Sequence, residues 1–425
     1  MTDAYRPRVV DDELDMLLPE LPSVALEGAK GVGKTLTARR RARTVHDLDA
    51  PGAAELFDAD PRRLIDGAPP VLLDEWQRVP SSWDLVRRAV DDDPSPGRFL
   101  LTGSAAPAGG GTHSGAGRIV RVRMRPLTLA ERGVGAPTVS LSRLLGGDRP
   151  PIEGSTSIGL ETYASEICRS GLPGLRALGG RALRAQLDGY LERIIDRDFA
   201  DVGQPIRTPG GLRRWMTAYG AATALTTSFE SIREAATPGE RDKPAKATAQ
   251  GYRETLERLW ILDPLPAWLP ASSHLRRLGL APRHHLADPA LAARLLGIDP
   301  NALLDASAAG PLTPRDGTLL GQLFESLVTL DVRVHAQRAE ARVGHLRTHS
   351  GDHEVDLIVE RGDHRVLAIE VKLSHTVRDD DVRHLRWLGD RLGHEMLDAI
   401  VITTGSDAYR RADGIGVVPA ALLGP

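Results

Sequence analysis

Short apolar runs alternate with helical patterns through the first 135 or so residues. The runs at 24–26, 71–73 and 99–101 predict buried strands, and the patterns at 36–45 and 82–90 predict helices. Strands that alternate with helices are typical of an α/β domain whose parallel sheet has helices on both faces. We therefore expect residues 1–135 to form one such domain.

Segments rich in Gly and Pro separate the regular elements. Residues 106–117 are rich in Gly, Ala and Ser, which predicts a mobile loop. Residues 136–160 read as a connection rich in Pro and Gly, and the pattern from 161 to 200 is helical. We expect residues 136–205 to form a linker and a helical lid.

Three helices and a short Pro-rich hairpin are predicted within residues 206–270, and this order is typical of a winged helix. The predicted helices are 212–223, 228–235 and 246–262, and the hairpin follows at 263–268. Lys246, Arg253 and Arg258 lie on or beside the third helix. The module therefore either contacts DNA through these cations or serves as a lid or spacer.

Strand patterns return in the last 150 or so residues. Apolar runs at 355–360, 366–371 and 399–402 predict strands, with a helix before the last of them. We expect residues 271–425 to form a second α/β domain.

A glycine-rich loop follows the first predicted strand. Its sequence, Gly-Ala-Lys-Gly-Val-Gly-Lys-Thr, matches the pattern G-x-x-x-x-G-K-[ST] between a strand and a helix. Gly28, Gly31 and Gly33 let backbone N–H groups curl around phosphates, and the helix N-terminus adds partial positive charge. Lys34 is expected to contact the β and γ phosphates of ATP, and Thr35 to bind Mg²⁺ through its hydroxyl.

Polar side chains end the next two predicted strands. Asp74 and Glu75 follow the apolar run at 71–73, and Thr102 follows the run at 99–101. Asp74 is expected to hold Mg²⁺ through its water shell, and Glu75 to polarise the attacking water as general base. Thr102 lies where a γ-phosphate sensor would sit. Together with the loop, these residues predict ATP hydrolysis.

Composition narrows the class of protein and its partners. A chain of 425 residues exceeds the size at which one hydrophobic core keeps growing, so we expect two to four domains. The hydrophobic and charged fractions, 41% and 26%, are ordinary for a globular protein. Because the net charge is only −3, any nucleic-acid site has to be a local basic patch. One basic run is interpreted as a solvated helix face, with a DNA or partner contact as the alternative: Arg39, Arg40, Arg41 and Arg43.

The cysteine and histidine residues give weaker signals. Cys168 is the single cysteine, which excludes an internal disulfide and fits a reducing cytosol. With no recognisable His base nearby, it is predicted to be a small core residue. His284 and His285 have no partner at metal-ligand spacing and are predicted to lie at the surface.

Targeting signals are not recognisable in the sequence. Residues 1–8 lack the basic-then-apolar pattern of a secretory signal, and no stretch approaches the roughly 18 apolar residues of a membrane helix. We expect a cytoplasmic protein that does not associate with membranes.

Two carboxylates and a lysine are predicted to meet on the C-terminal strands. Glu370 and Lys372 project from the same face because side chains alternate along a strand. If the turn before them contains three residues, 362–364, then Asp356 pairs directly with Glu370, at a Cβ separation of about 4.5–5.5 Å. Glu325 borders the buried face of a predicted amphipathic helix upstream. This arrangement predicts a divalent-metal site.

The order of phosphate loop, acidic strand end and polar strand end resembles an AAA-type ATPase. The chain is similar to a prokaryotic family of ATP-binding proteins that join such a domain to a C-terminal domain resembling restriction nucleases. The resemblance implies that Arg118 is an arginine finger supplied to a neighbouring subunit, with a plain surface arginine as the alternative. It also implies that the turn Gly171-Leu172-Pro173 contacts the adenine side through Pro173, with an ordinary loop turn as the alternative.

The C-terminal residues Glu325, Asp356, Glu370 and Lys372 resemble the PD-(D/E)XK nuclease signature. The resemblance implies that the carboxylates, with the Val371 carbonyl, hold one or two Mg²⁺ ions that generate and orient hydroxide, while Lys372 supports the attacking water. The alternatives are a nuclease-like fold kept for binding or assembly, and an ordinary exposed charge pair between Glu370 and Lys372.

Three functions follow from these patterns. The first is an ATP-driven enzyme acting on DNA, assembled as a homo-oligomer through the AAA-type domain. The second is an ATP-controlled oligomeric switch or scaffold with a catalytically silent nuclease-like domain. The third, a solute kinase, has no use for a second metal site.

Overall fold

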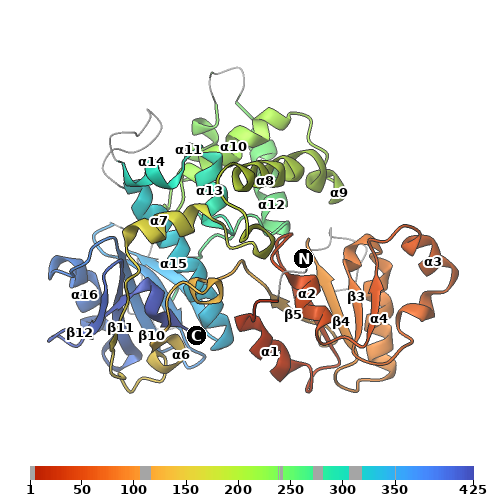
Figure 1. Ribbon diagram of the computed structural model, residues 1–425, viewed down its shortest axis with the longest axis horizontal. Coiled ribbons are helices and arrows are strands. Elements are labelled where there is room, and N and C mark those ends of the chain that lie inside the picture. Colours follow the sequence, from red (N-terminus) through yellow and green to blue (C-terminus); the bar gives the residue numbers. More distant parts are fainter. Residues whose placement is uncertain are drawn as a thin grey trace.

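The chain folds into an N-terminal α/β region, a helical middle region and a C-terminal region built on a mixed sheet (Figure 1). The computed structural model describes residues 5–105, 116–237, 239, 243–270, 281–305, 318–349 and 351–425. Most of the predicted mobile loop, residues 106–115, lies outside the described residues. In Figure 1 the middle region (green) lies above the N-terminal region (red and orange) and the C-terminal region (blue).

The N-terminal sheet has five parallel strands in the order β2-β3-β4-β1-β5. Its strands are β1 (Ser23–Glu27), β2 (Thr44–Asp47), β3 (Val71–Asp74), β4 (Phe99–Gly103) and β5 (Val120–Arg123). Helical segments of the region are α1 (Val9–Leu17), α2 (Lys34–Arg39), α3 (Ala53–Ala59), η1 (Pro61–Leu64), η2 (Trp76–Arg78), α4 (Ser81–Asp92) and α5 (Leu129–Arg132). The three central strands are buried at every position, which explains their apolar runs without alternation. The predicted strands and the parallel α/β class are confirmed.

The predicted helix at 36–45 is wrong in its second half. Helix α2 ends at Arg39, and residues 44–47 form strand β2 beside β3. Thr44 and Val45 are β-branched, and their backbone pairs with Val71 and Leu72. Tertiary pairing at the sheet edge therefore overrides the helical period of the apolar residues.

The middle region consists of helices. They are α7 (Leu160–Cys168), η3 (Pro173–Leu175), α8 (Gly180–Arg193), the π-helical turn η4 (Ile194–Asp198), α9 (Phe199–Asp201), α10 (Pro209–Ala221), α11 (Phe229–Ala235), α12 (Lys246–Arg258), α13 (Pro289–Leu295) and α14 (Pro300–Leu304). The three helices predicted for residues 206–270 are present, with bounds shifted by a few residues. The Pro-rich segment after them pairs with a later segment: Leu262 bridges Leu286, and Leu265 bridges Arg283.

This pairing explains why the surface prediction for His284 and His285 is wrong. Both side chains are buried, at 1% and 2% exposure. His284 Nε2 lies 2.6 Å from the Thr227 carbonyl oxygen, and His285 Nδ1 lies 3.1 Å from the Ser326 hydroxyl. Burial lowers the pKa of both imidazoles, so they are neutral core groups.

The C-terminal sheet has seven strands in the order β7-β12-β13-β11-β10-β9-β8. Its strands are β7 (Gly154–Ser155), β8 (Arg342–Arg347), β9 (Glu354–Glu360), β10 (Val366–Lys372), β11 (Met396–Thr403), β12 (Asp407–Arg410) and β13 (Gly416–Pro419). The remaining elements are β6 (Val139–Ser140), α6 (Leu141–Leu144), α15 (Thr318–Arg338), η8 (Asp380–Val382), α16 (Arg383–Leu392), η9 (Gly393–Glu395), η10 (Ala420–Leu422) and β14 (Leu423–Gly424). Side chains such as Leu367 and Ile369 share a core with α15, whereas Val366 and Ala368 share one with α16. The three predicted strands and the helix between them are confirmed.

The predicted connection at 136–160 contributes strands to the C-terminal region. Strand β7 pairs with β12 at the sheet edge, and β6 pairs in parallel with β14. Ser140 Oγ also donates a hydrogen bond to the carbonyl oxygen of Pro425. The segment that follows the N-terminal region in the sequence is therefore built into the C-terminal region.

Helix α15 has 21 residues, and many of its apolar side chains are buried in the core. Within the part of the chain that the structure describes, no helix combines the length and hydrophobicity required to span a lipid bilayer.

Candidate functional site

The phosphate loop leaves the carboxyl-terminal edge of the N-terminal sheet, between β1 and α2. Gly28 lies against the strand-end backbone of β5: a Cβ atom there would be 2.1 Å from the Met124 carbonyl oxygen. Gly31 and Gly33 have φ angles of 82° and 106°, which favour glycine. The three glycines therefore shape a loop that other residues could not follow.

Lys34 folds back onto this loop. Its ammonium group donates hydrogen bonds to the carbonyl oxygens of Gly28 and Ala29, at 2.8 and 2.9 Å, and the residue is 4% exposed. Burial lowers the Lys34 pKa to about 8, against the favourable charges of Glu75 and Asp74. Neutral carbonyl groups are thus the ligands of this cation, and a phosphate is a stronger partner for it.

Asp74 accepts hydrogen bonds from Thr35, the other predicted magnesium ligand of this region, and from Thr102, the predicted γ-phosphate sensor. Thr35 Oγ1 donates to Asp74 Oδ1 at 2.8 Å, and Thr102 Oγ1 donates to the same oxygen. The three side chains come from α2 and from the ends of the adjacent strands β3 and β4. Oxygen ligands of this kind fit Mg²⁺, so the donor set is compatible with the predicted ion.

Glu75 lies beside Asp74 in a left-handed backbone conformation, with φ of 56°. Its N–H donates to Thr102 Oγ1 at 3.1 Å, and its carboxylate accepts a hydrogen bond from Ser104 Oγ at 3.1 Å. Gln77 Nε2 donates to both Glu75 and Ser104. Ser104 and Gln77 thus orient the predicted general base, a role that the sequence analysis did not assign to either.

The basic run after the loop is not a uniform solvated face. Arg39 lies 3.6 Å from Asp74 and 3.7 Å from Asp47. Arg41 is paired with Asp11 and Asp15 and joins α2 to α1. Arg40 stacks over the Tyr5 ring at 4.3 Å. Three of the four arginines are therefore engaged within the N-terminal region.

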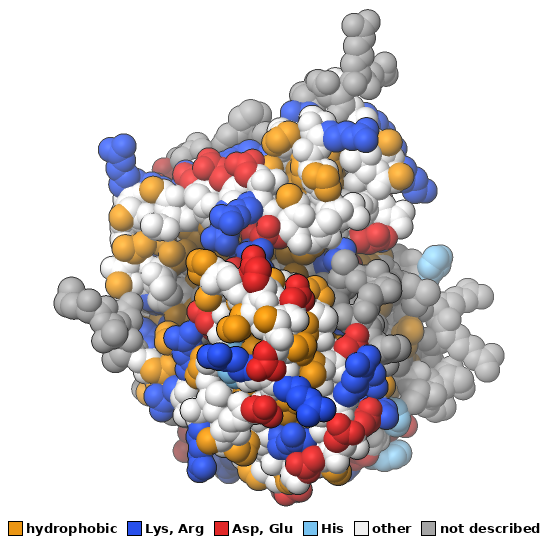
Figure 2. Space-filling view, turned by 90° about the vertical axis from the view of Figure 1, so that its right-hand side faces the viewer, with side chains coloured by type: hydrophobic (Ala, Val, Ile, Leu, Met, Phe, Trp, Pro, Cys, Tyr) orange, Lys and Arg blue, Asp and Glu red, His pale blue; other side chains and the backbone are white. Residues whose placement is uncertain are grey.

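The N-terminal region carries charges of both signs on the face that Figure 2 shows. Figure 2 looks onto the N-terminal region, and there Lys and Arg side chains are interspersed with Asp and Glu. The mixed pattern on this face indicates no extended positive field among its described residues.

Pro173, for which the resemblance implies an adenine contact, lies beside the phosphate loop. Its Cγ would be 3.6 Å from a Cβ atom at Gly33. A cavity of about 560 Å³ opens beside the loop, and Pro173 is part of its wall. The wall consists of Tyr5, Arg6, Pro7, Arg8, Gly33, Leu36, Thr37, Pro173, Gly174, Arg176 and Ala177. The cavity offers room for a base next to the loop.

The middle region contacts the phosphate loop directly. Lys30 Nζ lies 2.5 Å from Asp198 of η4, and Tyr190 of α8 donates to the Lys30 carbonyl oxygen at 3.1 Å. Arg78, just after Glu75, lies 3.3 Å from Asp201. Segments within residues 136–205, predicted to form a linker and a helical lid, therefore contact both the phosphate loop and the turn after Glu75.

Arg118 lies at the opposite edge of the sheet. Ser23 Oγ, at the start of β1, donates to the Arg118 carbonyl oxygen, whereas the loop follows the end of β1. The side chain of Arg118 is half-exposed and pairs with Asp91 at 2.7 Å. The length of β1, about 13 Å, separates it from the loop of its own chain.

The C-terminal strands have the predicted register. Arg361 N donates to the Arg365 carbonyl oxygen, which closes a three-residue turn, and Leu357 pairs with Ile369. Lys372 Nζ donates to Glu370 Oε1 at 2.8 Å. Instead of continuing the backbone ladder, Val371 N donates to Asp356 Oδ2 at 2.8 Å. Asp356, Glu370 and Lys372 therefore come together as expected.

A buried arginine lies among these carboxylates. Arg283 is 3% exposed, and its Nη1 donates to Asp356 Oδ1 at 3.0 Å and to Glu325 Oε1. Its Nη2 donates to Glu354 Oε1. We call Glu325, Glu354, Asp356 and Glu370 the C-terminal carboxylate cluster. Arg283 had no assigned role in the sequence analysis.

The cluster does not fit the predicted metal in this arrangement. Among the described residues, no group of three or more Asp, Glu, His or Cys side chains has a geometry that could hold a metal ion. Burial raises the pKa values of Glu325 and Glu370, and the Asp356 charge adds to this effect. Glu325, Asp356 and Glu370 are assembled at one place, but Arg283 is the cation that Glu325 and Asp356 share, and Lys372 pairs with Glu370.

A second buried charge cluster links all three regions. Asp263 accepts from Arg125 at 2.8 Å and lies 3.0 Å from Arg123 and 2.8 Å from Arg333. Burial opposes the charge on Asp263, but the three arginines hold its pKa well below the usual range. Arg333 belongs to α15, which also carries Glu325. One helix therefore contacts both the carboxylate cluster and the end of β5.

The basic residues of α12 do not form a common exposed surface. Lys246 is exposed, but Arg253 stacks over the Phe229 ring at 4.4 Å, and Arg258 is half-buried. Of the three basic residues predicted to contact DNA, Lys246 is therefore the one that is exposed.

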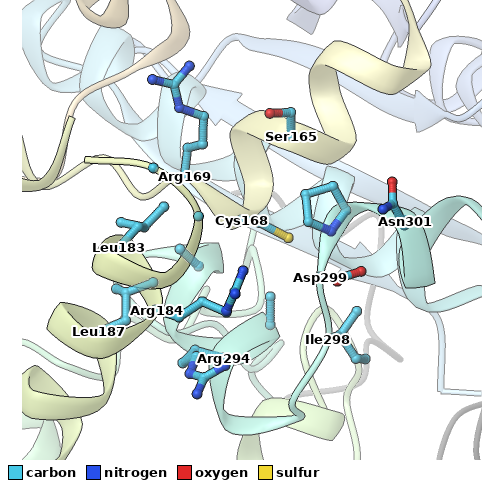
Figure 3. A pocket seen from close by; sticks show the side chains of 15 residues that line it. Ser165, Cys168, Arg169, Leu183, Arg184, Leu187, Arg294, Ile298, Asp299 and Asn301 are labelled. Atoms are coloured by element: carbon cyan, nitrogen blue, oxygen red, sulfur yellow. The ribbon is translucent and has the colours of Figure 1, made fainter. Parts of the chain in front are cut away.

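A separate cavity of about 380 Å³ lies within the middle region (Figure 3). Cys168 and Ser165 of α7, Leu183 and Arg184 of α8, and Arg294 of α13 contribute to its wall. The Cys168 thiol is half-buried beside the core, and burial raises its pKa to about 12, so it is not a thiolate nucleophile at neutral pH. The predicted small core residue thus lies at a cavity wall.

Comparison with known proteins divides the chain into three parts. Residues 21–132 match a family described as an AAA domain. Residues 160–302 match a domain of unknown function (DUF8612), and residues 320–423 match another (DUF4143). The AAA match supports the N-terminal part of the predicted resemblance.

Two mycobacterial proteins resemble most of the chain. Uncharacterized protein Mb2031c of Mycobacterium bovis and Uncharacterized protein Rv2008c of Mycobacterium tuberculosis are each 27% identical over 366 residues. The alignment covers 84% of this chain and 72% of each relative. The similarity thus spans the three regions together.

Proposed function

We propose that this chain binds MgATP at the phosphate loop and hydrolyses it as an AAA-type ATPase. The observation that carries the proposal is that Thr35 and Thr102 donate hydrogen bonds to the same oxygen of Asp74. The adjacent Glu75 donates its backbone N–H to Thr102, and its carboxylate accepts a hydrogen bond from Ser104. In this proposal, oxygen ligands suited to Mg²⁺ lie next to a carboxylate that accepts a proton from the attacking water. The match of residues 21–132 to an AAA domain supports it.

Each side chain has a role in this proposal. Lys34 would exchange its loop carbonyl partners for the β and γ phosphates. Thr35 would bind Mg²⁺ directly, and Asp74 would hold it through bound water. Glu75 would orient and deprotonate the attacking water, and Thr102 would sense the γ phosphate. Pro173 would contact the adenine side from the wall of the neighbouring cavity.

The test is phosphate release by the purified chain with MgATP. We expect Glu75→Gln to retain ATP binding and to lose at least about 100-fold in turnover, since general-base catalysis contributes 10²–10⁴-fold. Glu55→Gln, at an exposed glutamate of α3, is the matched control and should behave as the unmodified chain. Full turnover by Glu75→Gln would remove the general base from the proposal.

Arg118 supports the further proposal of a homo-oligomer. Its position at the far edge of the sheet means that it could stabilise a γ phosphate only in another copy. Mixing Arg118→Ala, which has an intact loop, with Lys34→Ala, which has an intact Arg118, tests this. Activity of the mixture, with neither variant active alone, would support a finger acting between copies. An active Arg118→Ala chain would refute it.

For the C-terminal region, we propose a binding or assembly role whose state follows the nucleotide. Arg283 within the carboxylate cluster favours this reading over metal-dependent cleavage of DNA. ATP-dependent assembly, measured by light scattering, should occur without cleavage of plasmid DNA in Mg²⁺ or Mn²⁺. The lid contacts of Lys30 and Arg78 supply a physical link from the nucleotide to the rest of the chain.

A DNA nuclease is the second candidate. The observation that favours it is the in-register meeting of Asp356, Glu370 and Lys372 at the end of β10. It predicts Mn²⁺-dependent cleavage that disappears in both Asp356→Ala and Lys372→Ala. Absence of cleavage by the unmodified chain, with and without ATP, would reject it.

A further inference from the structure

Arg283 is the shared cation of three carboxylates from two elements. Its Nη1 bridges Glu325 of α15 and Asp356 of β9, and its Nη2 contacts Glu354 of β9. Guanidinium groups bind carboxylates through several N–H groups at once, in a fixed planar geometry. The arginine therefore performs the charge-neutralising part of what a divalent cation would do at the same oxygens.

The backbone holds Arg283 firmly in this position. Its N–H donates to the Leu265 carbonyl oxygen at 3.0 Å, and its carbonyl oxygen accepts from Leu265 N at 2.9 Å. Leu265 is fully buried, and the next residue, His284, is buried as well. The side chain thus enters the cluster from a paired segment of the core.

The charges of the cluster require such a cation. Within the described part of the chain, the ion pairs of these four carboxylates are with Arg283 and Lys372, and Lys372 is engaged with Glu370. Carboxylates that lose water on burial are costly unless a counter-charge lies beside them. Removing Arg283 would leave Glu325, Glu354 and Asp356 without their cation, so another cation would be attracted strongly.

A metal ion and Arg283 need the same oxygen atoms. Divalent cations such as Mg²⁺ and Ca²⁺ take oxygen ligands at about 2.0–2.6 Å, which leaves no room for an N–H group at the same lone pair. Asp356 Oδ1 and Glu325 Oε1 are engaged by Arg283, and Asp356 Oδ2 is engaged by Val371 N. Glu370 Oε2 is buried and has no hydrogen-bond partner among the described residues.

We propose that Arg283 is an internal counter-ion that excludes divalent metal ions from the C-terminal carboxylate cluster. The unmodified cluster therefore binds no Mn²⁺ or Mg²⁺, and loss of Arg283 creates a binding site for one of these ions. This inference concerns the C-terminal region and does not depend on ATP hydrolysis.

The test is Mn²⁺ binding to the nucleotide-free full chain, measured from the electron paramagnetic resonance signal of free Mn²⁺. Arg283→Gln should gain one site, at least about tenfold tighter than any site in the unmodified chain. Adding Asp356→Asn to Arg283→Gln should abolish the gain. Arg294→Gln, which removes a guanidinium paired with Asp188 outside the cluster, is the matched control and should gain no site.

A second variant separates metal binding from folding. Arg283→Met combined with Glu325→Gln removes a cation and a carboxylate together, so the charge imbalance of the cluster does not increase. It retains Asp356, Glu370 and Lys372, and Mn²⁺ should raise its unfolding temperature while leaving that of the unmodified chain unchanged. The proposal is overturned if the unmodified chain binds Mn²⁺ at a site that Asp356→Asn abolishes. It is equally overturned if both folded Arg283 variants bind no more Mn²⁺ than the unmodified chain.

Phosphate release from MgATP distinguishes this outcome from failure of the proposed function. Arg283→Gln changes the cluster and leaves the phosphate loop intact, so turnover by folded protein reports on the ATPase alone. Loss of turnover in Glu75→Gln and gain of Mn²⁺ in Arg283→Gln are therefore independent results.

Discussion

The phosphate loop and the C-terminal carboxylate cluster both bury a cation beside carboxylates, but they use different partners. Lys34 donates to two neutral carbonyl oxygens and lies near Asp74 and Glu75 without bonding to them. Arg283 donates to three charged carboxylates. An incoming phosphate can replace neutral carbonyl groups at little cost, whereas an incoming metal has to displace a full ion pair.

This difference shows that a buried polar site can bind a ligand only if the chain itself does not already neutralise the charges of that site. The two sites contain comparable residue types, because each combines acidic strand ends with lysine. The availability of each site is decided by where the compensating charge comes from. At the N-terminal site the phosphates of a nucleotide would supply the charge that pairs with Lys34. At the C-terminal site Arg283 already supplies the charge that pairs with the carboxylates.

The largest expected effect tests the comparison at a third buried cluster, in which Asp263 is the carboxylate that three arginines share. Asp263→Ala leaves Arg123, Arg125 and Arg333 without their buried carboxylate. We expect the free energy of unfolding to fall by about 3–5 kcal/mol, which denaturant titration measures. Asp188→Ala, at a more exposed pair with Arg294, should cost about 1 kcal/mol or less. Equal costs for the two variants would show that the buried cluster is not special.

The next effect compares the two lysines. Lys34→Ala removes the cation of the phosphate loop, so the dissociation constant for MgATP should rise at least about 100-fold, as for a lost charge-assisted contact. Lys372→Ala should leave that constant unchanged, because Lys372 contacts Glu370 in the other region. Fluorescent-nucleotide titration measures both. A similar loss of affinity in the two variants would contradict the assignment of Lys34.

A pH series sharpens the role of burial at Lys34. Because burial lowers its pKa to about 8 in the free chain, the ammonium form is lost as pH rises through 8. Phosphate binding requires that form, so affinity for ATP should be constant below pH 7 and fall by up to about tenfold per pH unit above 8. In Lys34→Arg the side chain stays charged, and the slope should disappear whatever its absolute affinity.

The smallest effect concerns Asp331, a buried carboxylate of α15 that accepts from Leu129 N at 3.1 Å. Burial raises its pKa to about 8, above its unfolded value, so the folded chain binds more protons between about pH 4 and 8. Its contribution to stability is therefore present at low pH and lost as pH rises towards 8. Relative to the unmodified chain, Asp331→Asn should gain up to about 1.4 kcal/mol of stability per pH unit as pH rises from 5 to 8. Asp12→Asn, at an exposed position, should show no such trend.

Much of the fold could be predicted because its signals are local. The buried strands β1, β3 and β4 are apolar runs, and the phosphate loop is a contiguous motif. The register of β9 and β10 followed from one turn length, so the meeting of Asp356 with Glu370 needed no tertiary information. The predicted helix at 36–45 was too long, because strand pairing between Val45 and Leu72 takes over after α2 ends.

The residues that sequence analysis missed act across long separations. Arg283 reaches Asp356, 73 positions later, because it pairs with Leu265 in the core. The same pairing buries His284 and His285, which looked like scattered surface histidines. Nothing in the local sequence of Arg283 distinguishes it from an ordinary arginine. The burial of Arg283 can be recognised only from the partners that the fold supplies.

The contacts at the two ends of helix α15 limit where residues can be inserted into or deleted from this chain. Between Glu325 in the carboxylate cluster and Gln337, which donates to Glu13 and to the Arg123 carbonyl oxygen, the helix rises by about 18 Å. One inserted residue would turn one end by about 100° relative to the other and separate either Glu325 or Gln337 from its partners. We expect relatives to vary in the segments around α15 and to keep its length between these two residues unchanged.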